Sequence, residues 1–147
     1  MNKFRVAAVG ALMLALVAAG QGFKVYPGAT VYTPPDTEEA REAKKALPPG
    51  MTSTIYTTKD PFEKVVDFYK ALGKEYSIPG MPKGRKLPSG QDLEQSYFIF
   101  DGAADLGTSK SWVTVQRPFI GSVDLKGGAP EYKDVRDLTV ITLAEKK

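Results

Sequence analysis

The chain contains neither cysteine nor histidine. Without a thiol it can form no disulfide, and without imidazole or thiolate it lacks the ligands of ordinary zinc sites. The same two absences exclude the Ser-His-Asp and Cys-His systems of nucleophilic catalysis. The chain also has no Walker loop and no Rossmann glycine fingerprint. We therefore expect no metal and no cofactor, and the sequence favours a non-enzymatic protein over an enzyme.

The chain also has little net charge, and two of its basic residues lie close to the N-terminus. The sequence has 20 basic and 17 acidic residues among 147, a net charge of +3. Lys3 and Arg5 precede a run without charge from Val6 to Gly20. A basic start, a short apolar run and small residues at its end are typical of a secretory signal peptide. The run is shorter than the roughly 20 residues that span a bilayer, although an uncleaved anchor or a buried helix is the alternative.

We accordingly expect a signal peptide over residues 1–20 and a single domain over residues 21–147. Without Lys3 and Arg5 the remaining chain has 18 basic and 17 acidic residues, a net charge of +1. This balance argues against nucleic acid as a partner, because nucleic-acid-binding domains usually carry a clustered basic face. No cysteine is available to carry a lipid, so we expect no stable membrane insertion once the leader is removed. The expected location is the periplasm or the extracellular space.

The segment 59–75, KDPFEKVVDFYKALGKE, carries the strongest secondary-structure pattern. Asp60, Pro61 and Glu63 predict a helix start with a capping box and proline at the first helical position. Gly73 is placed to end the helix. The apolar residues recur at steps of three and four and predict one buried stripe. They are Phe62, Val65, Val66, Tyr69 and Leu72, with Phe68 beside them.

The remaining patterns predict strands around this helix. FKVYPGATVY reads as strand, turn and strand, and the alternating residues 51–58 read as a half-buried strand. Further strands are expected at about 96–101, 111–120 and 137–144. Residues 36–47 predict a short, charged surface helix capped by Thr37 or Asp36, and residues 75–90 predict an irregular loop rich in proline and glycine. The expected fold is α+β, an antiparallel sheet of about 4–5 strands with one major amphipathic helix packed on it.

Two sets of charged residues are candidates for function. Lys83, Arg85 and Lys86 lie in the predicted loop and could bind an anionic polymer, a phosphate head group or an acidic partner. Four acids surround the first strand after that loop, and a pair of carboxylates could hydrolyse a glycosidic bond. They are Asp92, Glu94, Asp101 and Asp105. Trp112 and Tyr97 are expected in the core or on a sheet face rather than in a ligand platform.

Three short motifs resemble a pattern found in small exported bacterial proteins and lipoproteins of unknown function. In that pattern a YPGA turn precedes a helix of the form TxDxFxxVxxFY, and the last strand contains a TVIT-like run. The matching segments here are Tyr26–Ala29, Asp60–Leu72 and Thr139–Leu143. The helix at 36–47 departs from the pattern as an insertion, and the lipid-bearing cysteine is missing. The resemblance implies a fold and a compartment, and it implies no site.

These observations lead to one main hypothesis and two alternatives. The main hypothesis is an exported, non-enzymatic binding or accessory domain with a protein or anionic-polymer partner in the cell envelope. The first alternative is a carboxylate-dependent hydrolase that acts on a sugar or phosphate substrate. The second is a domain that binds an anionic surface through the basic residues 83–86.

Overall fold

The computed structural model describes residues 22–147, so the leader predicted over residues 1–20 lies outside the described residues. The described part is an α+β fold with two helices and antiparallel strands, as the sequence predicts. The helices are α2 (Glu38–Lys45) and α3 (Phe62–Lys70). The strands are β1 (Thr30–Tyr32), β2 (Met51–Thr58), β3 (Lys74–Tyr76), β4 (Gly84–Lys86), β5 (Asp92–Ile99), β6 (Ser111–Arg117), β7 (Phe119–Asp124), β8 (Glu131–Arg136) and β9 (Thr139–Lys146).

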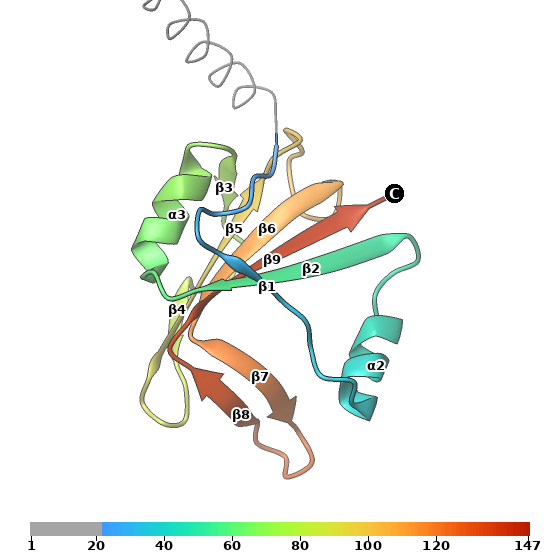
Figure 1. Ribbon diagram of the computed structural model, residues 1–147, viewed down its shortest axis with the longest axis vertical. Helices are drawn as coiled ribbons and strands as arrows, with labels where there is room; N and C mark the ends of the chain where they lie inside the picture. The colour runs from blue at the N-terminus through green and yellow to red at the C-terminus, as the bar shows by residue number, and fades with distance from the viewer. Residues whose placement is uncertain (1–21) are drawn as a thin grey trace, which may run out of the picture.

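Seven of these strands form one sheet, and the other two form a separate hairpin. The order across the sheet is β1-β2-β9-β6-β5-β3, with β4 pairing beside β3 on the edge of β5. β7 and β8 pair only with each other among the described strands. Figure 1 shows this hairpin projecting from one end of the sheet, and α2 standing apart from the strands. The expectation of about 4–5 strands was therefore too low.

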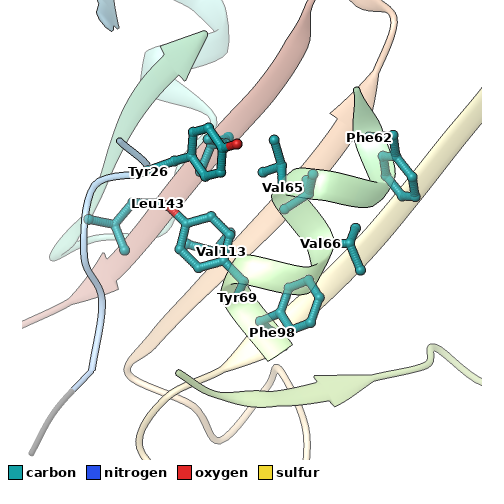
Figure 2. Packing of buried hydrophobic residues seen from close by; sticks show 10 residues of the cluster. Tyr26, Phe62, Val65, Val66, Tyr69, Phe98, Val113 and Leu143 are labelled. Atoms are coloured by element: carbon teal, nitrogen blue, oxygen red, sulfur yellow. The ribbon is translucent and has the colours of Figure 1, made fainter. Parts of the chain in front are cut away.

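Helix α3 covers one side of the sheet, which we call the helix face. Phe62, Val65, Val66 and Tyr69 are buried, as their spacing predicts, and Leu72 is partly buried against the same cluster. They meet Phe98 of β5, Val113 and Val115 of β6, and Ile141 and Leu143 of β9. Figure 2 shows several of these side chains packed together around Tyr69. This cluster is the hydrophobic core of the described fold.

The segment before β1 completes the core instead of forming the first predicted strand. The Phe23 ring stacks on the Tyr69 ring with 5.9 Å between centroids. The Tyr69 hydroxyl donates a hydrogen bond to the Lys24 carbonyl at 2.8 Å. Tyr26 is also buried, and its ring meets Phe68 edge to face. Residues 23–26 are thus held by side-chain packing against α3, and no strand is assigned to them.

The predicted capping box of α3 is wrong. The cap position is Pro61, and no side chain caps the helix. The Asp60 carboxylate instead accepts a hydrogen bond from the Tyr26 hydroxyl at 2.6 Å and lies 3.5 Å from the Lys64 ammonium. The Asp60 carboxylate thus contacts Tyr26 and Lys64 instead of capping the helix. Gly73 follows the helix, as predicted. A side chain at this position would clash, because its Cβ would lie 2.6 Å from Cδ1 of Phe100.

Several predicted loop and strand bounds also need correction. The segment 75–90 contains the end of β3 and all of β4, so it is not wholly irregular. The strand expected at 96–101 begins earlier, at Asp92, and ends at Ile99. The strand expected at 111–120 is divided into β6 and β7 at Pro118, which has no N–H to continue the ladder. Residues Glu131–Arg136 form β8, where the sequence analysis predicted no strand.

Candidate functional site

The three basic residues of the predicted loop lie on or beside β4, and two of them are paired with acids. The Lys83 ammonium contacts the Glu75 carboxylate, and the Lys86 ammonium lies 2.6 Å from an Asp92 oxygen. Burial alone would raise the pKa of Glu75, but Lys83 outweighs it and holds that pKa below the usual value. Arg85 is exposed and has no ion pair among the described residues. The cluster therefore presents less positive charge than its sequence suggests.

Two of the four candidate acids hold the β5–β6 connection in shape. The Asp101 carboxylate accepts hydrogen bonds from the Lys110 amide at 2.6 Å and the Ser109 hydroxyl at 3.0 Å. The Asp105 carboxylate accepts one from the Thr108 amide at 2.8 Å. These bonds stabilise the charged carboxylates, so the amide of Lys110 lowers the pKa of Asp101 and the amide of Thr108 lowers that of Asp105. Both acids are ionised at neutral pH and are poor proton donors.

The other two acids lie on β5. Asp92 is exposed and paired with Lys86, as described above. Burial raises the pKa of Glu94, and the neighbouring charges of Glu63 and Asp92 raise it further, against the opposing effect of Arg117. None of the four acids lines either of the two hollows described next. The residues that sequence reasoning singled out are thus divided between the β4–β5 edge and a structural turn, and they line no common cleft.

A small hollow lies between β5 and the segment that connects β3 to β4. Its walls include Tyr76, Met81, Lys83, Gln95 and Tyr97. Its volume of about 20 Å³ is enough for a single water molecule. It is too small to admit a substrate or a side chain of a partner.

A much larger groove lies between α2, the sheet and the β7–β8 hairpin. It encloses about 1920 Å³ of space and is open to solvent along its length. Ala40, Ala43 and Leu47 line it from the α2 side, and residues 51–55 of β2 line it from the sheet. All six residues of β7, Phe119–Asp124, line it as well. This groove is far larger than the hollow beside β5.

The sheet contributes its second side to the groove, which we call the open face because no helix packs on it. Partners in an antiparallel pair point to the same side, and neighbours along a strand alternate. The register therefore places one row across the sheet on the open face: Tyr76, Tyr97, Thr114, Thr142, Ile55 and Tyr32. All six are partly buried. Thr114, Thr142, Ile55 and Tyr32 also line the groove.

Two other pairs of open-face side chains contact each other. The Gln95 amide donates a hydrogen bond to the Gln116 amide oxygen at 2.7 Å. Trp112 is partly buried, and the Lys146 ammonium lies 5.3 Å from the centroid of its ring. Tyr97 and Trp112 are thus sheet-face residues, in line with the expectation from sequence.

Charge along the groove is balanced. Its acids are Asp36, Glu39, Asp124 and Asp134, and its basic residues are Arg41, Lys44, Lys126 and Lys133. Some of these charges pair, since Arg41 lies 2.8 Å from Asp36 and Lys133 lies 3.5 Å from Asp124. Val123 and Leu125 are 47% and 68% exposed and add apolar surface at the hairpin. The groove suits a partner of mixed polar and apolar character better than a highly charged polymer.

Within residues 22–147, no group of three or more acids is placed to hold a metal ion, and no helix is both long and apolar enough to cross a membrane. Comparisons with protein-family models, with curated proteins and with solved structures find no match to this chain.

Sequence reasoning missed the groove because its walls come from segments far apart in the chain. Two local signals bear on it. Pro34 and Pro35 come one residue after β1, and a proline pair predicts that a strand stops there. The small alanines of α2 predict a helix that buries little, and α2 indeed has no buried residue.

Proposed function

We propose that this protein is an exported, non-enzymatic accessory domain that binds a protein partner in the groove between α2, β2 and the β7–β8 hairpin. The observation that carries the proposal is the groove itself. Its volume and open ends suit a segment of a macromolecule, and its balanced charge argues against a nucleic acid or a strongly anionic polymer. Export is supported by the basic, apolar and small-residue order of residues 1–20.

The chemistry of the candidate residues also favours binding over catalysis. The chain has no histidine or cysteine, and Asp101 and Asp105 are committed to holding a turn. Lys83 and Lys86 are paired with acids, which weakens the case for an anionic surface as the main ligand. The exposed Val123 and Leu125 instead offer the apolar contacts that protein interfaces use at their centres.

Site-specific photocrosslinking in the cells that produce the protein tests the groove. A photoreactive amino acid is placed at Ala43, which is exposed on α2 and lines the groove. The matched control carries it at Asp67, an exposed position of α3 that does not line the groove. We expect a protein adduct from position 43 and none from position 67. Equal adducts at both positions, or none at either, would contradict a groove-specific partner.

Export is tested separately. Cell fractionation with N-terminal sequencing and intact mass of the recovered protein should find a chain in the periplasm or medium that starts near Gln21. A full-length chain confined to the cytoplasm would remove the exported part of the proposal and leave the groove to be judged by crosslinking.

A further inference from the structure

The outer edge of β2 is paired over only part of its length. β1 pairs with Ile55, Tyr56 and Thr57, and β9 pairs with all eight residues of β2 on the other side. Residues 51–54 therefore have a neighbouring strand on one side only. Unpaired edges present backbone donors and acceptors that another strand can use.

The ladder indicates which backbone groups of this edge point outward. In an antiparallel pair, residues alternate between hydrogen-bonded and non-hydrogen-bonded positions. The Lys147 amide donates a hydrogen bond to the Gly50 carbonyl at 2.9 Å, one residue beyond the facing pair Met51 and Lys146. In an antiparallel ladder this position of the bond makes Met51 and Lys146 a non-hydrogen-bonded pair. The backbone groups of Met51 and, two residues on, Ser53 therefore point away from β9. The Met51 amide is already bonded to the Pro48 carbonyl at 3.1 Å.

Ser53 is the position where the pairing with β1 would continue and does not. The register opposes Tyr32 to Ile55, so its extension would place Pro34 opposite Ser53. Proline has no N–H to donate, and β1 ends at Tyr32. The Ser53 amide and carbonyl and the Met51 carbonyl make no hydrogen bond to any described residue. Ser53 is also exposed, so these groups are accessible from the groove.

The space beside this edge is open. Residues 51–55 line the groove on one side, and Ala40, Ala43 and Leu47 line it from α2. Since α2 buries no residue, the helix does not fill the space next to the strand. Figure 1 shows α2 standing away from β2, connected by the chain that enters β2 and the chain that leaves β1.

We propose that an extended segment of a partner polypeptide adds as a strand to the edge of β2 at Met51–Thr54. It would lie next to β2 where the pairing with β1 ends at Tyr32. The inference rests on the proposed function and names how the partner is held. Ser53 supplies one donor and one acceptor, and Met51 supplies a second acceptor. The partner residue opposite Ser53 points its side chain to the open face, on the side of the groove. The apolar lining from Leu47, Val123 and Leu125 favours an apolar side chain there.

The test uses a defined probe, an acetylated and amidated hexapeptide of alternating threonine and valine. It is titrated into the isotopically labelled protein, and backbone amide resonances are followed by NMR. We expect the Ser53 amide to shift most, together with its neighbours on β2 and the facing residues of α2. The same hexapeptide with an N-methyl group on every residue has no residue N–H on either edge and should lose binding. No shift at β2, or equal binding of the methylated peptide, would overturn the inference.

Two variants of the protein sharpen the test. Ser53→Pro removes the outward N–H while leaving the β2–β9 ladder intact, because that N–H does not point to β9. It should weaken peptide binding about 10-fold, which corresponds to about 1.4 kcal/mol. Ser53→Ala keeps the backbone and should bind as the wild type does. Should Ser53→Pro fail to fold, the methylated peptide decides the question alone.

Other occupants give distinct results. A dimer of the wild-type protein that Ser53→Pro dissociates, seen by analytical ultracentrifugation, would show that a second copy covers the edge, and the inference would be wrong. Crosslinking from Ala43 that is unchanged in Ser53→Pro, without peptide binding at β2, would retain the proposed function and refute strand addition.

Discussion

Substitution of Tyr69 separates the contributions that hold α3 on the sheet. Its side chain is fully buried, contacts the rings of Phe23, Phe68 and Phe98, and donates its hydroxyl to the Lys24 carbonyl. Tyr69→Phe removes only the hydroxyl and leaves that carbonyl without its partner, which should cost about 1–2 kcal/mol. Tyr69→Ala also removes the ring and should cost about 3–5 kcal/mol. Tyr69→Asp adds a buried charge and should exceed the about 5–15 kcal/mol that stabilises a typical domain.

Urea unfolding followed by circular dichroism measures the series. With a slope of about 1.5 kcal/mol per molar, Tyr69→Phe should lower the unfolding midpoint by about 1 M and leave the slope unchanged. A matched Asp67→Ala variant on the exposed side of α3 should shift the midpoint little. A Tyr69→Asp protein that unfolds cooperatively near the wild-type midpoint would refute the placement of this residue in the core. A Tyr69→Phe protein as stable as the wild type would refute the docking of the segment before β1.

Four other predictions concern single side chains. The hydrogen bond from Tyr26 lowers the pKa of Asp60, so its carboxylate stabilises the fold above about pH 4 and that stability is lost as the pH falls. Asp60→Asn should flatten the acid side of a melting-temperature profile between pH 7 and 2, and an unchanged acid limb would contradict the contact. Burial raises the pKa of Tyr26 to about 12, so stability present below pH 10 should fall as the pH approaches 12, and Tyr26→Phe should reduce that fall in the same assay. Asp101→Ala should lower the free energy of unfolding by about 1 kcal/mol because the exposed Lys110 amide exchanges a charged acceptor for water, and an unchanged urea midpoint would contradict a stabilising role for this bond. Thr37→Ala removes the hydrogen bond to the Ala40 amide and should speed hydrogen exchange in α2. Global stability should not change, because α2 buries no residue, and a fall in global stability would place α2 in the cooperative core.

The elements that the sequence predicted well are those defined by local rules. The stripe from Phe62 to Tyr69 repeats at helical spacing and is buried as expected. Thr37 caps α2, one of the two cap residues that its sequence offered. The alternation in residues 51–58 predicted β2 with the same bounds. Each of these depends on contacts within a few residues, where pattern and propensity act directly.

The elements that the sequence missed depend on distant partners. Asp60 looked like a helix cap, but Tyr26, 34 residues earlier, occupies its carboxylate. β4 has only three exposed residues and exists because β5 lies beside it. Lys83 and Lys86 resembled a free basic loop, yet Glu75 and Asp92 come next to them only once β3, β4 and β5 have paired. The groove is a further case, since three separate segments form its walls. No local pattern contains these pairings.

The position of β9 determines when this fold can form. β9 is the last strand in sequence order but lies at the centre of the sheet, between β2 and β6. Without β9, the sheet would consist of two separate parts, β1–β2 on one side and β6, β5, β4 and β3 on the other. Neither part alone completes the core. Pairings between segments so far apart in sequence form slowly, since a long loop must close before they stabilise the chain. A chain passing through a membrane in sequence order, as proposed, would reach the far side before its central strand is available. On the proposed export route, the sheet could therefore close only after β9 has also crossed the membrane.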